Sequence, residues 1–222
     1  MTAVSPNPPN QWMLQVLYVL VKFSVQLHGR IDGMSKVAVL LVQGFADWEY
    51  ALVGGTGGPF YGLDIQYFTP VTGEVCSQGG LTATVTQDLE TLEKWKPDAI
   101  VVVGGMIWET GEAPDISSVL KAQHARGAVV AGICGGTLAL ARAGLLNDVH
   151  HTSNAPDFLG QNADGYKGAE RYVSSLSAIL EDRVITAPGT APVSFTAAIF
   201  EGVGLDQEKV AQFKAMLAAE HT

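Results

Sequence analysis

Short runs of consecutive apolar residues recur along the chain, at residues 37–42, 99–103 and 128–131. Such runs are typical of strands that are buried on both faces of a parallel sheet. The segments between them have helical character and predict helices over residues 47–53, 89–95 and 115–126. Strands that alternate with helices predict an α/β fold, in which a mainly parallel sheet carries helices on both faces.

The rest of the chain continues this pattern. We predict strands at residues 64–69, 172–180 and 183–186, a hairpin of 75–76 with 81–86, and helices at 137–143, 191–200 and 207–219. The sequence Gly-Gly-Thr-Gly-Gly-Pro at residues 54–59 predicts a flexible loop that ends the first helix, because glycine and proline break helices. This glycine run lacks the Gly-Lys-Ser/Thr ending of a phosphate-binding loop.

The first 33 residues differ in character from the remainder of the chain. Residues 1–10 are polar and rich in proline, and the apolar stretch after them is interrupted by Gln15 and Lys22. That stretch is shorter than the roughly 20 apolar residues of a membrane span, and no basic residue precedes Lys22 as a signal peptide requires. We interpret residues 1–33 as an N-terminal extension that is either disordered or foreign to the native protein, although residues 21–27 alternate as a half-buried strand does. Residues 34–222 are expected to form a single domain.

Composition excludes several classes of function. The net charge is −9 and the calculated isoelectric point is about 4.9, which argues against a surface that binds phosphate or nucleic acid. Two cysteines are too few for a disulfide scaffold and lack the spacing of a metal site. We therefore expect a cytoplasmic protein that binds a small molecule, without a metal, a cofactor, a membrane or a nucleic acid.

The most informative residue is Cys134, which lies between glycines in the sequence Gly-Ile-Cys-Gly-Gly at the end of a predicted strand. This pattern is a nucleophile elbow with cysteine in place of serine, and active sites of parallel sheets form at the carboxyl ends of strands. The helix after the turn should lower the thiol pKa through its dipole. The alternative is an inert cysteine packed as a small apolar residue, which describes Cys76 better.

Two other strand ends carry candidate partners for Cys134. Gly104 and Gly105 follow the second run, and their amides could form an oxyanion hole, or else a plain turn. Glu49 follows the first run. It either lies on an exposed helix face or is buried beside the thiol, where its pKa would rise and it could hydrogen-bond the sulfur.

A histidine could also reach the sulfur. The sequence His-His-Thr-Ser-Asn at residues 150–154 begins 16 residues after Cys134, far enough for the chain to return over the site after one helix. His151 would then pair with the thiol, as in other cysteine enzymes. Adjacent histidines in an exposed loop are the alternative.

Taken in order, these motifs resemble the ThiJ/PfpI superfamily, which has the class I glutamine amidotransferase-like fold. The resemblance covers residues 36–204. It rests on the first apolar run with Gly-Phe-Ala-Asp-Trp-Glu at 44–49, on Val-Val-Val-Gly-Gly at 101–105, on the cysteine turn, and on Ile-Thr-Ala-Pro-Gly-Thr-Ala-Pro at 185–192. The chain is most similar to a bacterial subgroup named for glutamine amidotransferases.

The resemblance implies a flavodoxin-like sandwich that commonly forms a homodimer. It also implies that Cys134 is the reactive thiol, that Glu49 is its partner, and that the Gly105 amide donates to an oxyanion, with Gly135 and Asn154 beside them. The chain departs from the superfamily where many members place a histidine and this chain has Asn154; His151 would substitute for it. Gly135 replaces the histidine that follows the cysteine of the superfamily's peptidases. Residues 189–193 lack the His-x-Glu of glutamine amidotransferases.

The sequence therefore predicts a cysteine-dependent enzyme that acts on a small electrophile. The favoured chemistry is hydration or hydrolysis of an α-oxoaldehyde, as in glyoxalases and deglycases, with Cys134 as nucleophile and Glu49 or His151 moving the proton. Proteolysis and glutamine hydrolysis are disfavoured. The alternative from another class is a redox sensor or stress protein in which Cys134 is oxidised to a sulfinic acid.

Overall fold

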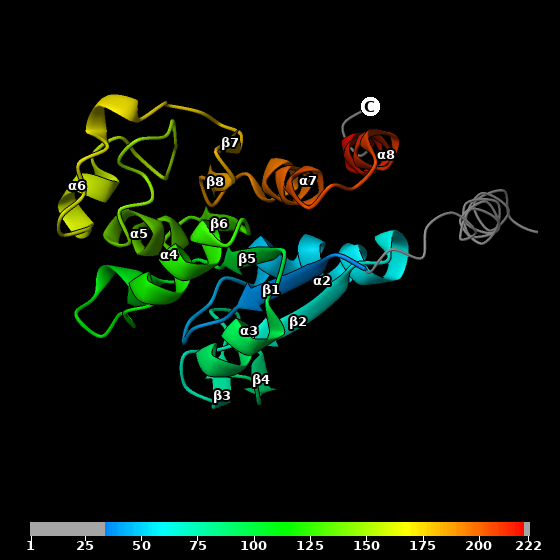
Figure 1. The fold of residues 1–222 in the computed structure, drawn as a ribbon, viewed down its shortest axis with the longest axis horizontal. Helices are drawn as coiled ribbons and strands as arrows, with labels where there is room; N and C mark the ends of the chain where they lie inside the picture. Colours follow the sequence, from blue (N-terminus) through cyan, green and yellow to red (C-terminus); the bar gives the residue numbers. More distant parts are fainter. Residues whose placement is uncertain (1–33, 220–222) are drawn as a thin grey trace, which may run out of the picture. The chain divides into compact units, whose positions relative to one another are not determined.

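A six-stranded sheet forms the centre of the protein (Figure 1). The computed structural model describes residues 34–219, so our interpretation of residues 1–33, including a strand at 21–27, lies outside the described residues. All strands are parallel except the edge strand β7, which confirms the predicted α/β class. The order across the sheet is β2 (Asp64–Phe68), β1 (Lys36–Leu40), β5 (Ala99–Val102), β6 (Val129–Ile133), β8 (Val184–Ala187) and β7 (Ile179–Glu181).

Helices cover both faces of this sheet (Figure 1). Alternate residues of the strands point to opposite faces, so Val37 and Val39 pack in one core and Ala38 and Leu40 in the other. The first core is closed by α2 (Asp47–Tyr61), α7 (Pro192–Gly202) and α8 (Gln207–Ala218). The second is closed by α3 (Leu89–Trp95), α4 (Ser117–Ala125), α5 (Gly136–Arg142) and the short α6 (Phe158–Asn162). Two 3₁₀ turns, η1 (Met106–Glu109) and η2 (Ala169–Arg171), lie in connecting segments.

The predicted hairpin and the helix after it are both present. Strands β3 (Gly73–Cys76) and β4 (Thr82–Val85) pair antiparallel and form a separate two-stranded sheet. Helix α3 has the predicted limits because Asp88 caps it, its carboxylate accepting a hydrogen bond of 2.8 Å from the Thr91 amide. Here local sequence signals are sufficient to define the structure.

The prediction that the glycine run at residues 54–59 breaks the first helix is wrong. Helix α2 continues through the run and ends at Gly62, which has the left-handed conformation with φ of 70°. The glycines allow close packing: a Cβ atom on Gly54 would lie 2.2 Å from the Tyr67 hydroxyl, and one on Gly57 would lie 3.0 Å from Ile65. Small residues therefore bring α2 against β2, and tertiary packing outweighs their low helix propensity.

The long strand predicted at residues 172–180 is also wrong. Only its end pairs with the sheet, as β7 against β8. Ser175 and Ser177 instead bond locally, with the Ser175 hydroxyl donating to the Ser177 carbonyl, and the side chain of Leu176 is 90% exposed. Between Tyr172 and Ala178, which pack against the two cores, the segment runs over the surface and pairs with no strand of the sheet.

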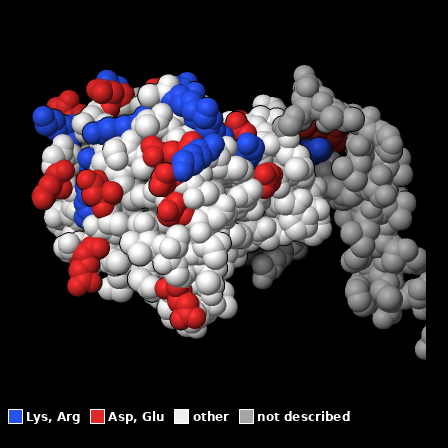
Figure 2. Space-filling model, turned by 60° about the horizontal axis from the view of Figure 1, so that its bottom comes forward, with Lys and Arg blue, Asp and Glu red and all other residues white. Residues whose placement is uncertain are grey.

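Charged residues of both signs lie together on part of the surface (Figure 2). Figure 2 shows Lys and Arg side chains interspersed with Asp and Glu on one face of the molecule, so that face offers no purely basic area for phosphate. None of the helices within residues 34–219 is long and apolar enough to cross a membrane. The same residues contain no cluster of His, Cys, Asp and Glu that could hold a metal ion.

Candidate active site

Cys134 occupies a sharp turn between β6 and α5. Its φ of 55° lies in the left-handed region, which is uncommon for a residue with a side chain. The backbone amide of Cys134 donates a hydrogen bond of 3.0 Å to the carbonyl of Ala187 at the end of β8. The glycines on either side make room for the turn, because a Cβ on Gly136 would lie 2.3 Å from the carbonyl oxygen of Val102. The geometry is that of a nucleophile elbow.

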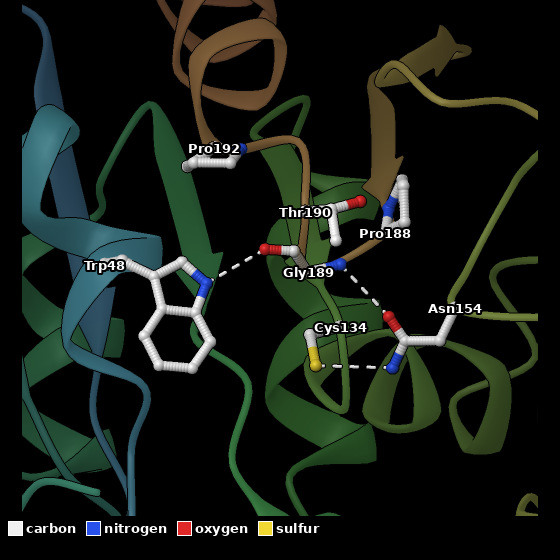
Figure 3. A pocket seen from close by; sticks show the side chains of 7 residues that line it. All are labelled: Trp48, Cys134, Asn154, Pro188, Gly189, Thr190 and Pro192. Atoms are coloured by element: carbon white, nitrogen blue, oxygen red, sulfur yellow. Dashed lines mark hydrogen bonds between the residues drawn. The ribbon is translucent and has the colours of Figure 1, made fainter. Parts of the chain in front are cut away.

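One side chain donates a hydrogen bond to the sulfur. The Asn154 side-chain amide donates to Sγ at 3.3 Å (Figure 3), and both this amide and the Gly135 backbone amide lower the thiol pKa. Hydrogen bonds to a sulfur favour its charged form. The residue that faces Cys134 from the 150–154 segment is therefore Asn154.

Glu49 lies buried beside the thiol, which excludes an exposed helix face. It sits in the first turn of α2, and its Oε2 accepts a hydrogen bond of 2.7 Å from the Gly104 amide. Its Oε1 is buried without a hydrogen-bond partner among the described residues. A Cβ placed on Gly189 would lie 3.0 Å from Sγ of Cys134 and 3.1 Å from Oε1. The sulfur and the free carboxyl oxygen thus face the same small space.

The thiol and the carboxyl influence each other's protonation. Burial raises the pKa of Glu49 to about 7, although the Gly104 amide opposes the shift. Burial and then the Glu49 charge raise the pKa of Cys134 to about 11. The predicted lowering of the thiol pKa is therefore wrong, because burial outweighs the helix dipole and the Glu49 charge adds to the increase. Because two negative charges cannot coexist cheaply in this space, the pair loses one proton near pH 7 and the second only far above it.

The two predicted oxyanion donors differ in availability. The Gly104 amide is taken by Glu49, so the expectation that both amides are free is wrong. The backbone of Gly105 packs directly against the elbow, since a Cβ on Gly135 would lie 2.8 Å from the Gly105 carbonyl oxygen. Of the two amides, that of Gly105 therefore remains as the candidate oxyanion donor.

His151 is not brought to the sulfur. Its side chain is fully buried, with Nδ1 2.8 Å from the Val149 carbonyl and Nε2 2.6 Å from the Tyr166 hydroxyl. The rings of Tyr166 and Tyr172 pack edge-on against it, and burial lowers its pKa. Both ring nitrogens are occupied, so the structure gives no support to a proton shuttle through His151. It anchors the segment that carries Asn154.

Sequence reasoning missed the walls of the site. A pocket of about 720 Å³ opens above the sulfur (Figure 3). It is lined by Trp48, Cys134, Asn154, Pro188, Gly189, Thr190 and Pro192. Most of these residues follow β8, the fifth parallel strand, which is not among the three strand ends that the sequence analysis singled out. Applying the same rule to that strand would have found them.

The backbone of Gly189 is hydrogen-bonded to two side chains that line this pocket. Its carbonyl accepts a hydrogen bond of 2.9 Å from the Trp48 indole, and its amide donates to the Asn154 side-chain oxygen at 3.0 Å. Asn154 therefore bridges the Gly189 loop and the sulfur of Cys134. An asparagine performs this bridging without a titratable group.

Asn154→Ala should slow alkylation of Cys134 by iodoacetamide at pH 8 about tenfold, because a hydrogen bond to a charged group contributes roughly 1.5 kcal/mol. Rates are measured by mass spectrometry of the peptide that contains Cys134. The exposed Cys76 in the same sample is the internal control. An unchanged rate at Cys134 would show that Asn154 does not stabilise the thiolate.

The chain matches a family profile and is similar to two curated proteins. The sequence profile of the DJ-1/PfpI family matches residues 35–202. The chain is 30% identical over 174 residues to the Bacillus subtilis protein named uncharacterized protease YoaZ, covering 75% of this chain and 82% of that protein. It is 29% identical over 175 residues to uncharacterized protease YdeA of the same organism, covering 78% and 85%.

Solved structures agree with this match. The DJ-1 superfamily protein Atu0886 from Agrobacterium tumefaciens has 37% sequence identity and a TM-score of 0.80, over 85% of this chain and all (100%) of that one. A thiJ/pfpI family protein from Bacillus anthracis has 22% identity and a TM-score of 0.71, over 82% of this chain and 91% of that one. The second likeness concerns the fold alone.

Proposed function

The chain belongs to the DJ-1/PfpI family, and from this membership and the site geometry we propose that it is a cysteine-dependent enzyme acting on small carbonyl electrophiles. The observation that carries the proposal is the pairing of Cys134 with the buried carboxyl of Glu49 under an open pocket. A carboxyl group with a pKa of about 7 can both give and take a proton at neutral pH. The best substrate class is an α-oxoaldehyde such as methylglyoxal.

The proposed reaction adds water to methylglyoxal and gives lactate. The Glu49 carboxylate takes the thiol proton of Cys134 as the sulfur adds to the aldehyde carbon, and the resulting alkoxide takes that proton from Glu49 to give a hemithioacetal. The Glu49 carboxylate then removes the hydrogen from that carbon as a proton and returns it to the neighbouring ketone carbon, while the hydroxyl proton of the hemithioacetal passes to the former ketone oxygen; the product is a 2-hydroxy thioester. Water cleaves the thioester, releasing lactate and regenerating the thiol. The Gly105 amide would stabilise the alkoxide.

This chemistry suits the site better than peptide hydrolysis does. An aldehyde addition has no amine to expel, whereas a cysteine peptidase needs an acid, usually histidine, to protonate the leaving amine. Among residues 34–219, no histidine hydrogen-bonds the sulfur of Cys134. We also propose that the chain is related to the glutamine amidotransferase subgroup. Hydrolysis of glutamine is nevertheless disfavoured, because residues 189–193 contain neither His nor Glu.

The test is lactate formation from methylglyoxal by the purified protein, its Cys134→Ser variant and its Cys76→Ser variant. We expect turnover by the wild type, unchanged turnover by Cys76→Ser, and loss of at least about a thousandfold in Cys134→Ser because the nucleophile is removed. A casein assay run in parallel tests the protease name of the relatives. Equal rates in all three proteins would reject a cysteine mechanism. No turnover, together with ready oxidation of Cys134 by peroxide, would favour the redox sensor.

A further inference from the structure

The walls of the pocket above Cys134 carry no charge in the part of the chain that the structure describes. The lining includes an indole and two prolines, Trp48, Pro188 and Pro192, and its polar side chains are the neutral Asn154 and Thr190. Within residues 34–219, no Lys, Arg or His lines the pocket. An ionised substrate would therefore find no counter-ion on these walls.

Trp48 is the largest apolar surface in this pocket and is held in one orientation. It projects from the first turn of α2, and its indole N–H donates to the Gly189 carbonyl (Figure 3). Since that donor is already used, the ring can offer only its apolar surface to a ligand. The side chain is 49% exposed, so part of the ring is accessible. In Figure 3 the indole lies on one side of the Cys134 sulfur and Asn154 on the other.

The base of the pocket adds a negative charge. The pair formed by Glu49 and Cys134 carries one charge once its first proton is lost, and the whole chain has a net charge of −9. A carboxylate substituent beside the reacting carbonyl would be brought toward this charge in a poorly solvated space. Both the walls and the base thus disfavour anionic substrates.

We infer that the pocket selects uncharged carbonyl compounds that carry a flat apolar substituent, such as aryl α-oxoaldehydes, and that Trp48 is the residue that determines this selectivity. The inference rests on the proposed function for its chemistry. The substituent would lie against the indole while the aldehyde carbon meets the sulfur. Pro192, the first residue of α7, gives the same pocket a second rigid apolar surface.

Steady-state kinetics with three aldehydes that differ only in their substituent test the selectivity. Phenylglyoxal should exceed methylglyoxal in kcat/KM by about tenfold, given the extra apolar area of a phenyl group. 4-Carboxyphenylglyoxal, which keeps the α-oxoaldehyde and adds a carboxylate to the ring, should fall at least about tenfold below phenylglyoxal. Trp48→Ala should raise KM for phenylglyoxal about tenfold and change kcat less, because the ring binds the substituent and not the reacting atoms.

Two variants make the assignment specific. Trp48→Phe keeps an aromatic ring but loses the bond to Gly189, so it should retain most of the phenylglyoxal preference. Phe60→Ala removes an exposed aromatic ring (43%) from the same helix outside the pocket and should leave all three values unchanged. Equal loss for phenylglyoxal and methylglyoxal in Trp48→Ala, or a loss as large in Trp48→Phe, would overturn the role of the ring as a selectivity determinant.

A binding measurement separates this inference from the proposed function. Acetophenone has the phenyl ketone but no aldehyde, and pyruvate has the carboxylate, so each can be tested as a protector of Cys134 against iodoacetamide. Protection by millimolar acetophenone and none by pyruvate would support the inference even if no aldehyde is turned over, in which case only the proposed function fails. Equal protection by both, or stronger protection by pyruvate, would overturn it.

Discussion

Glu49→Gln is expected to lower aldehyde turnover by about a hundredfold, the usual contribution of a positioned acid and base. The amide keeps the shape of the carboxyl group, and its oxygen can still accept the Gly104 hydrogen bond. It cannot release a proton to the alkoxide or remove one from carbon. The Cys134 thiolate should form more readily in this variant, because the Glu49 charge that raises the thiol pKa is gone.

The same substitution should stabilise the fold at alkaline pH. Burial raises the pKa of Glu49 from its ordinary value of 4.5 to about 7 in the folded protein. Between these values the unfolded state has released a proton that the folded state retains, so the free energy of unfolding falls as pH rises through this window. A shift of this size corresponds to roughly 3 kcal/mol, an upper bound for the gain in Glu49→Gln above pH 7.

Chemical denaturation at pH 4 and pH 8 measures the change in stability. The pH dependence of Cys134 alkylation measures the change in the thiol pKa. The two proteins should be similar in stability at pH 4, and the variant more stable at pH 8. Alkylation of the variant should follow a single titration. If the wild type and Glu49→Gln were equally stable at both pH values, burial would not hold Glu49 protonated. If Glu49→Gln turned over the aldehyde as fast as the wild type, Glu49 would have no part in the mechanism.

Gly136→Ala should destabilise the protein by at least about 1–3 kcal/mol, the range for overpacking a buried site. The new Cβ would lie 2.3 Å from the carbonyl oxygen of Val102, which belongs to the central strand β5 and cannot turn aside as a side chain can. Either β5 or the start of α5 must move, and Cys134 moves with the helix. Thermal unfolding and Cys134 alkylation should therefore change together.

Gly55→Ala is the matched control for this change. Gly55 lies within α2, and nothing is within 4 Å of a Cβ built on it, so alanine should stabilise the helix by up to about 1 kcal/mol. A higher midpoint for Gly55→Ala with a lower one for Gly136→Ala fits this account. A neutral Gly136→Ala would show that the elbow has more room than its geometry indicates.

The sheet and most helices could be predicted because apolar runs and helix caps are formed by residues that are neighbours in the sequence. Helix α3 has the predicted limits, and the neighbouring residue Asp88 supplies its cap. The continuation of α2 through its glycines depends instead on Tyr67 and Ile65, which lie on the neighbouring strand β2. Nothing within the run of glycines itself indicates that packing, and the same sequence in isolation would break a helix.

The site also contains residues that local sequence predicts and residues that it does not. Cys134 and Glu49 could be predicted because each follows a strand whose end is recognisable in the sequence. The choice between His151 and Asn154 could not be made, because it depends on which side chain the segment turns inward. Tyr166 decides it by binding the His151 ring in the core, which leaves Asn154 to face the sulfur.

The contacts around Cys134 join parts of the chain that are far apart in sequence. Asn154 reaches the sulfur across 20 residues, Gly189 reaches Asn154 across 35, and Trp48 reaches Gly189 across 141. Closing such long loops is slow, so these contacts should form only when β8 joins the sheet beside β6. Before that step Cys134 is an ordinary solvated thiol. The alkylation rate of Cys134, measured at successive times of refolding, should therefore change at the moment when β8 pairs with β6.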